Sequence, residues 1–219
     1  MPSPEQILAA STMIANRWLP LAVAWHVVIA VVITLIFTRQ LSRRTIAAVL
    51  TVAMASVSLM AWSVNNPVNG GVFALIAVAQ GWITTRTRTA TAAPTTGALM
   101  IIGALSVAFG WFYPHFLPDR SPWTYSYAAP MGLLPCPTLA MIAGVALLSG
   151  VLETRARALL IGLAALIYGL IGVIVLGVSI DLMLIAAAIV VLVNGLTKPR
   201  ASIATAVRPA PRAPGSAPA

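Results

Sequence analysis

Residues 158–196 read ALLIGLAALIYGLIGVIVLGVSIDLMLIAAAIVVLVNGL, and this stretch decides the fold class. It is almost uniformly apolar and about twice as long as the roughly 20 residues that one helix needs to cross a bilayer. Its only charged residue is Asp181. A carboxylate is costly at the middle of a bilayer and much cheaper at a turn near the interface. We therefore expect two membrane-spanning helices that are joined by a tight hairpin at residues 179–181.

The rest of the chain has the same character. Of its 219 residues, 60% are hydrophobic and only 8% are charged, whereas soluble domains carry roughly a quarter charged residues. A surface that faces lipid needs no charge, and the apolar residues come in long blocks that end at Arg, Pro or Asn. The sequence predicts an all-α fold, a polytopic membrane helix bundle, with seven transmembrane helices at residues 18–37, 45–64, 70–83, 96–113, 129–151, 158–178 and 181–196.

Basic residues collect in alternate loops of this arrangement, as they do in the cytoplasmic loops of membrane proteins. One side of the predicted bundle has only Arg17 and Arg120, and the other holds Arg39, Arg43, Arg44, Arg86, Arg88, Arg155, Arg157, Lys198 and Arg200. This pattern predicts a multi-pass protein of the cell inner membrane with its N-terminus outside and its C-terminus in the cytoplasm. Six spans are the alternative, but that count puts the basic C-terminal flank on the wrong side.

The chain divides into three parts. Residues 1–17 form an N-terminal segment, and its Ser3, Pro4 and Gln6 are typical of a helix start. This segment is either a helix lying on the membrane surface or a loosely ordered extension. Residues 18–197 form the transmembrane bundle. Residues 198–219 are an Ala- and Pro-rich basic tail, which we expect to be disordered.

Several functional classes are disfavoured by the charged residues and the cysteine content. The net charge of +9 comes from basic residues at the ends of apolar blocks, which is typical of topology signals and not of nucleic-acid binding. The single cysteine excludes an internal disulfide or a multi-cysteine metal site. Lys198 lies beyond the last span, so no lysine is placed to hold retinal. The four acids, Glu5, Asp119, Glu153 and Asp181, all fall at predicted interfaces or loops, which argues against ion-coupled transport.

The motif Pro135-Cys136-Pro137-Thr138 lies several residues inside the predicted fifth span. Two prolines so close together remove two backbone donors and favour an extended or broken segment. Broken helices of this kind line substrate sites in transporters. The alternative is a structural kink, or a span that starts late after a re-entrant stretch at residues 129–134. We take all four residues as candidate substrate-binding residues.

Two histidines and several aromatic residues form the second group of candidates. His26 lies about eight residues into the first span, where an ionisable side chain is a candidate for function. The alternative is a neutral histidine that bonds to a neighbouring helix. Trp111, Tyr113 and His115 belong to an aromatic stretch around the predicted outer loop, which is either an interfacial belt or a cap over an outward-facing cavity. A metal or haem shared by His26 and His115 is a further alternative.

Small and polar residues suggest how the helices pack. The predicted sixth span carries a row of small residues at spacings of three and four, which lets another helix approach closely. We expect this row to pack against the seventh span. Its members are Gly162, Ala165, Gly169 and Gly172. The polar residues near span ends are expected to cap helices or to bond between them, and they are Asn66, Asn69, Gln80 and Asn194.

The order of these features resembles a family of bacterial multi-pass membrane proteins known only as a domain of unknown function. The resemblance rests on residues 4–6, on Asn66-Pro67, on residues 132–138 (GLLPCPT) and on residues 177–182 (GVSIDL), and it covers about residues 4–195. The Pro-Cys-Pro-Thr element is its most specific part. The resemblance implies the membrane fold and a bacterial inner-membrane location, and it carries no activity.

We therefore expect a small permease or channel-like protein for a neutral or weakly polar solute, with the lipid bilayer as its surroundings. No metal or cofactor is expected, and enzymatic activity is the less favoured interpretation. A non-catalytic membrane partner or assembly factor is the first alternative. A membrane redox or haem protein that uses His26, His115 or Cys136 is the second.

Overall fold

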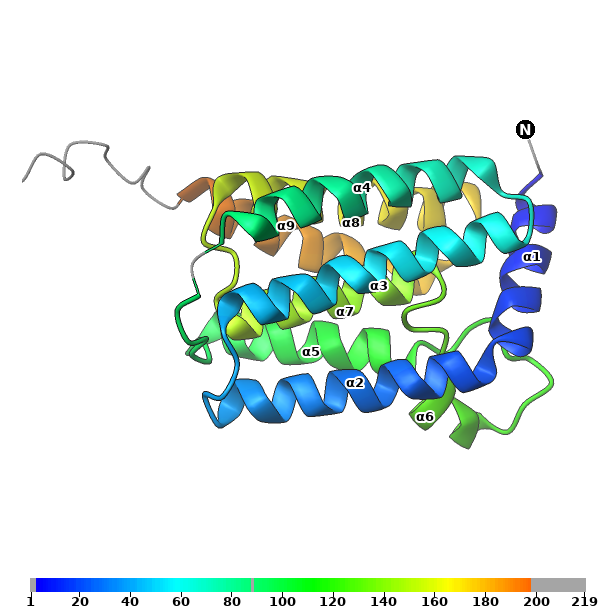
Figure 1. The fold of residues 1–219 in the computed structure, drawn as a ribbon. Helices are drawn as coiled ribbons and strands as arrows, with labels where there is room; N and C mark the ends of the chain where they lie inside the picture. Colours follow the sequence, from blue (N-terminus) through cyan, green and yellow to red (C-terminus); the bar gives the residue numbers. More distant parts are fainter. Residues whose placement is uncertain (1–2, 88, 198–219) are drawn as a thin grey trace, which may run out of the picture.

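The computed structural model describes residues 3–87 and 89–197, and the predicted tail at 198–219 lies outside them. Helices make up 77% of the structure and the described part contains no β-strand, which confirms the all-α prediction. The helices (Figure 1) are α1 (Pro4–Arg17), α2 (Leu19–Phe37), α3 (Arg43–Ser63), α4 (Pro67–Thr85), α5 (Ala98–Phe112), α6 (Tyr125–Ala128), α7 (Pro135–Ser149), α8 (Arg155–Leu170) and α9 (Leu182–Thr197). Short 3-10 turns lie at Pro122–Thr124 and Ser179–Asp181, and a π-helical turn at Ile171–Val175.

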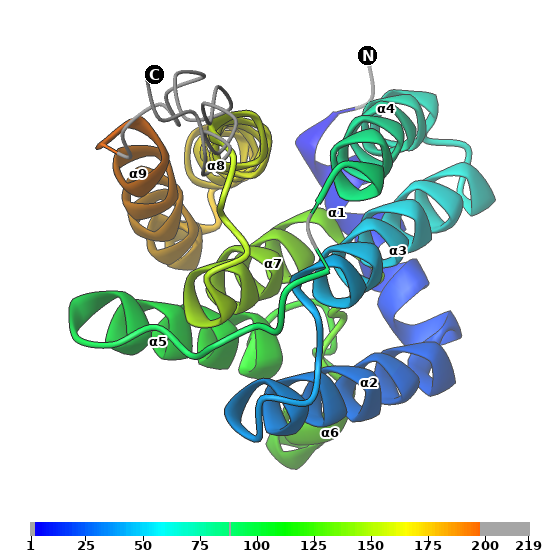
Figure 2. The ribbon, with the colours of Figure 1, turned by 60° about the vertical axis from the view of Figure 1, so that its left-hand side comes forward.

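Seven of these helices run side by side in alternating directions, and α1 lies across one end of them (Figures 1 and 2). We call this the α1 end of the bundle. Five helices of the described part are long and apolar enough to cross a membrane, namely α2, α3, α4, α8 with its π-helical continuation, and α9 with its preceding turn. The apolar helices α5 and α7 have only 15 residues each. By length and composition, these five helices are compatible with a multi-pass membrane protein.

Helix α1 begins as its sequence indicates. Ser3 caps the helix, because its hydroxyl accepts from the backbone N–H of Gln6 at 3.3 Å and the Gln6 side chain accepts from the N–H of Ser3 at 2.8 Å. This reciprocal pair satisfies two of the donors that a helix start leaves free. Ile14 and Ala15 are buried, so the C-terminal half of α1 packs against the bundle.

The outward faces of the bundle carry large apolar side chains. Val27, Leu59, Leu75, Val78 and Ile174 are each more than half exposed. Soluble proteins rarely leave such contiguous apolar surface in water, because every exposed carbon costs free energy. These faces are compatible with contact to the hydrocarbon of a bilayer.

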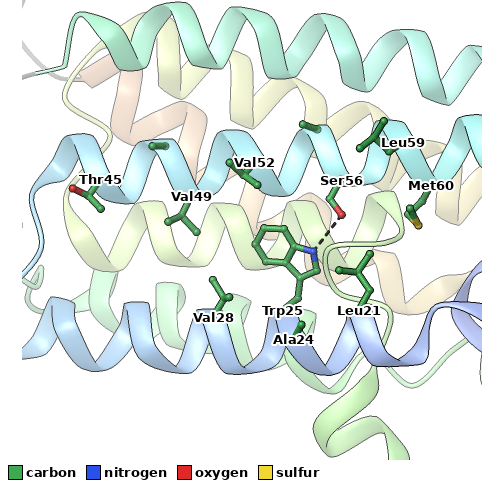
Figure 3. A pocket seen from close by; sticks show the side chains of 12 residues that line it. Leu21, Ala24, Trp25, Val28, Thr45, Val49, Val52, Ser56, Leu59 and Met60 are labelled. Carbon is green, nitrogen blue, oxygen red and sulfur yellow. Dashed lines mark hydrogen bonds between the residues drawn. The ribbon is translucent and has the colours of Figure 1, made fainter.

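A groove on this surface lies between α2 and α3 and has a volume of about 620 Å³. Its walls are almost entirely carbon, and the Nε1–H of Trp25 donates to the Ser56 hydroxyl across it at 3.2 Å (Figure 3). The groove contains none of the predicted substrate-binding residues. It therefore belongs to the lipid-compatible surface of the bundle.

Helix α7 lies at the centre of the bundle, among α3, α5, α8 and α9 (Figure 2). Every residue from Pro137 to Ser149 is buried. A helix that is apolar on all sides is stable only where other helices surround it. On one side α5 approaches very closely, since a Cβ atom added to Gly144 would come within 2.6 Å of the backbone N of Val107.

The predicted start of this helix at Ala129 is wrong, because α7 begins at Pro135. Proline favours the first helical position, where its missing N–H is not needed and its fixed φ suits the helix. The preceding residues 129–134 form a buried non-helical stretch. Gly132 in this stretch has φ +78°, and the Trp25 ring lies against it in the space that a side chain would fill. The late-start alternative is the correct one.

The last two helices form the predicted hairpin. The row of small residues in α8 faces α9, where Gly162 packs against Leu192 and Gly169 against Ile185. Close approach of this kind is the usual way in which membrane helices gain packing energy. The chain turns at Ser179–Asp181 as expected.

Candidate functional site

A buried carboxylate lies at the α1 end of the bundle. Asp181 is only 1% exposed, and the Tyr113 hydroxyl donates a hydrogen bond of 2.8 Å to its Oδ1. Asp181 ends the short turn Ser179–Asp181 that precedes α9. The turn lies where the sequence predicts it, but the side chain points back into the protein, where a buried charge needs partners.

Gly172 makes room for this carboxylate. A Cβ atom at position 172 would overlap Oδ2 of Asp181. Gly172 lies in the π-helical turn Ile171–Val175, and its carbonyl accepts from the backbone N–H of Val178 at 2.8 Å, which closes the hairpin. π-Helical turns inside α-helices are frequent at functional sites. In this chain the π-helical turn places Gly172 directly against the Asp181 carboxylate.

Cys136 reaches the same place from the first turn of α7. Its thiol lies beside the Tyr113 hydroxyl and the Asp181 carboxylate, close enough to interact with both. The thiol also lies 3.9 Å from the carbonyl oxygen of Tyr168, to which it can donate. The side chain is half-buried. Because Pro135 starts α7 here, Cys136 lies at a helix start and not at a break within a span.

His115 completes this group from the loop that follows α5. Its ring lies edge-on to Tyr113 with 6.5 Å between ring centroids, and Phe116 stacks on Tyr113 at 6.1 Å. His115 is half-buried, and burial lowers its pKa, while the nearby Asp181 charge acts in the opposite direction. His115 and Cys136 are thus the members of the group that are partly exposed, whereas Tyr113 and Asp181 are buried.

We call these four residues, Tyr113, His115, Cys136 and Asp181, the Asp181 cluster. They come from the end of α5, the following loop, the start of α7 and the turn before α9. The sequence singled out Tyr113 and His115 in one group and Cys136 in another, and it gave no sign that the two groups meet. It missed Asp181 as a site residue, although its place as the only acid in the longest apolar stretch was the signal that could have found it.

A cavity of about 360 Å³ adjoins the cluster at the α1 end. Its wall is mostly apolar, and Cys136 lies in it next to Pro135. The polar part of the wall includes Asn69 and Tyr168, whose hydroxyl donates to Oδ1 of Asn69 at 3.0 Å. Sequence reasoning placed Asn69 only as a cap or interhelix bond and did not single out Tyr168. Volume and lining match a site for a small molecule.

Pro137 and Thr138 follow Cys136 in the sequence but do not take part in the cavity wall. Both are buried, and neither lines the cavity. The Thr138 hydroxyl donates to the Leu134 carbonyl at 2.6 Å and accepts from the Gly132 N–H at 2.9 Å. Backbone groups of a non-helical stretch inside a bilayer need such partners. Thr138 therefore holds residues 132–134 in place.

His26 and Trp111 form a separate contact between α2 and α5. Their rings meet edge-on with 4.7 Å between centroids. The Nδ1 atom of His26 lies 2.8 Å from the Ala22 carbonyl oxygen, and Nε2 lies 3.1 Å from the Trp111 carbonyl oxygen. A backbone oxygen thus faces each ring nitrogen. His26 does not line the cavity, so its geometry matches a histidine that joins two helices.

Within residues 3–87 and 89–197, no three His, Cys, Asp or Glu side chains are grouped as metal ligands would be. The Asp181 cluster supplies a carboxylate, a thiol, a phenol and an imidazole, which together can hold and pass a proton. Comparison of the chain with protein-family models, with curated proteins and with solved structures finds no match.

Proposed function

We propose that this chain is a small inner-membrane permease for a neutral or weakly polar solute. In this proposal, the seven helices that run side by side all cross the membrane. The N-terminus and the α1 end lie outside, and the C-terminus lies in the cytoplasm. The short helices α5 and α7 are extended at the α1 end by buried or packed segments, which offsets their length. The basic loops at the opposite end support this orientation.

The observation that carries the proposal is the cavity beside Cys136. It lies at the α1 end, which is the outer end in this orientation, and it reaches the start of the central helix α7. A non-helical segment at membrane depth is tolerated where protein buries it or where it lines a cavity. Residues 129–134 meet this condition, because they are buried and Leu134 lies in the cavity wall.

The wall of the cavity indicates the class of solute. No Lys, Arg, Asp or Glu lies in the wall, and its polar side chains are neutral: Ser11, Asn66, Asn69, Cys136 and Tyr168. An ion would lose its hydration here without a counter-charge, which is costly in apolar surroundings. A small molecule with one or two hydrogen-bonding groups and an apolar body can use the Asn69 amide and still match the apolar wall.

A flux experiment with liposomes that contain the purified protein tests this proposal. Stopped-flow swelling would be measured for glycerol, urea, acetamide and short-chain alcohols. We expect at least one of them to cross faster than in protein-free liposomes. Asn69→Leu removes the amide while keeping a similar volume, and we expect that flux to fall at least tenfold. The matched control is Asn194→Leu, which makes the same change at a half-buried amide of α9 outside the cavity.

A thiol reaction tests the cavity itself. Cys136 is the only cysteine of the chain, so a charged, membrane-impermeant methanethiosulfonate has one target. We expect it to modify Cys136 from the outside of intact cells and to block the flux, with Cys136→Ala as the unreactive control. Absence of flux for every solute, or equal flux in wild type and Asn69→Leu, would contradict the proposal.

A further inference from the structure

The Asp181 carboxylate has no cationic partner. In the part of the chain that the structure describes, the only ion pair joins Arg43 and Glu153 at the opposite end of the bundle. The titratable groups that face Asp181 are the Tyr113 hydroxyl from the end of α5, the Cys136 thiol from α7 and the His115 ring from the loop after α5. From the π-helical turn that follows α8, Gly172 lies against Oδ2 of Asp181 and presents no side chain.

A carboxylate in such a place is far more costly than a carboxylic acid. Taking an unpaired ionised group out of water costs many kcal/mol, and the protein relieves this cost by leaving the group protonated. One hydrogen bond from Tyr113 reaches Oδ1, and Oδ2 lies against Gly172. The other acids differ, since Glu5 and Asp119 are exposed and Glu153 is paired with Arg43.

The cluster also provides a route for the proton. His115 is half-buried in the loop at the α1 end and lies near enough to Asp181 for their charges to interact. A hydronium ion from the outer solution protonates the imidazole and leaves water behind. The imidazolium then releases that proton toward the carboxylate, and the products are neutral imidazole and carboxylic acid. The Tyr113 ring lies edge-on to His115 and its hydroxyl donates to Oδ1, so in this route Tyr113 passes its own proton to Oδ1 and takes one from the imidazolium. Atoms and charge balance at each step.

We propose that Asp181 is the proton-binding group of this protein and that it couples the movement of the solute to that of a proton. Cys136 makes the connection, because it lies in the cavity wall and is near enough to the Asp181 carboxyl group to interact with it. The coupling rests on the proposed permease function, whereas the binding of the proton does not.

Infrared spectroscopy of the protein in lipid bilayers tests the proton directly. We expect wild type at neutral pH to show the carbonyl stretch of a protonated carboxylic acid, and Asp181→Asn to lose it. Asp119→Asn and Glu153→Gln remove carboxylates that are exposed or paired, and both should keep the band. Tyr113→Phe should shift the band to higher frequency, because it removes the hydrogen bond to Oδ1. This variant also keeps the test valid if Asp181→Asn fails to fold.

The outcomes separate the two proposals. Absence of the band in wild type at neutral pH, or its persistence in folded Asp181→Asn, would overturn the proton site. A band without flux of any solute would leave the proton site standing and would count against the permease. Where flux is seen, an acidic outside should accelerate uptake in wild type several-fold and have no such effect in Asp181→Asn. If the rate of solute uptake by wild type does not change with the pH gradient, the proposed coupling is overturned.

Discussion

Buried polar side chains are the most informative single residues of this structure. Gln80 in α4 is completely buried, and neither its amide nitrogen nor its amide oxygen has a hydrogen-bond partner. Asn69 and Asn66 behave as the sequence predicts, since Asn69 bonds to Tyr168 of α8 and Asn66 caps α4. The sequence also predicts that Gln80 caps a helix or bonds between helices, and this prediction is wrong because its side chain makes no hydrogen bond. A buried amide without partners costs about 1–3 kcal/mol.

Gln80→Met should therefore stabilise the protein. Methionine has nearly the same length and shape, and it removes both unsatisfied groups without opening a cavity. We expect a gain of about 1 kcal/mol, measured by thermal loss of helical circular dichroism in detergent. Gln40→Met, at an exposed loop position, is the control and should change little. A lower melting temperature for Gln80→Met would mean that the amide is satisfied by something other than protein.

Arg157 is a basic residue whose burial could not be inferred from its position in the sequence. The sequence suggests a loop arginine that marks the cytoplasmic side. In the structure Arg157 is buried in the first turn of α8, and its guanidinium donates to the Val151 carbonyl oxygen at 2.8 Å and to the Thr87 hydroxyl at 2.5 Å. It thus ties the end of α4 to the start of α8.

At the scale of elements, the pair α5 and α7 holds the centre of the bundle together. Both are too short to cross a bilayer comfortably on their own, and they pack on each other through glycines. Gly110 of α5 lies over the backbone of α7 at Pro137, and Gly144 of α7 lies over the backbone of α5 at Val107. Backbones that approach this closely gain dispersion energy along their whole length.

Gly144→Ala should break this contact. The added methyl group would lie 2.6 Å from the backbone N of Val107 and 2.7 Å from the carbonyl oxygen of Gly103, and backbone atoms cannot move aside cheaply. We expect a loss of roughly 1–3 kcal/mol, measured as lower resistance to denaturant. Gly71→Ala in α4 is the matched control, because nothing lies within 4 Å of the new Cβ. That change should be neutral or raise stability by up to about 1 kcal/mol.

Over the whole molecule, the Asp181 cluster and a group of loop arginines lie at opposite ends of the bundle. The Asp181 cluster, the cavity and α1 lie at one end, whereas Arg39, Arg43 and Arg44 lie at the other. If the seven helices that run side by side all cross the membrane, as we propose, the end that carries these arginines faces the cytoplasm. The positive-inside bias then holds the protein in this orientation.

Reporter fusions test this orientation and the number of spans together. Alkaline phosphatase is active only outside the inner membrane, and a fluorescent protein fused to an exported end usually stays dark. We expect a C-terminal fluorescent fusion to be bright and a C-terminal phosphatase fusion to be inactive, and phosphatase inserted after Asp119 to be active. An active C-terminal phosphatase would contradict seven spans and favour six.

The sequence by itself determined the all-α class, the hairpin at residues 179–181, and the positions of the long helices to within a few residues, except for the start of α7, which lies at Pro135 and not at Ala129. These properties are local, because a helix satisfies its own backbone and an apolar stretch of sufficient length favours lipid wherever it lies. Proline chemistry could also have placed the start of α7 at Pro135, but the run of apolar residues before it hid that boundary.

Only the tertiary structure decided that Tyr113, Cys136 and Asp181 meet, and that His26 and Trp111 form a separate contact. The direction of a side chain depends on the rotation of each helix about its axis, and that rotation is set by packing against all its neighbours. For Asp181 the decisive neighbour is Gly172, whose missing side chain leaves the space that the carboxylate occupies. No local pattern around residue 181 contains this information.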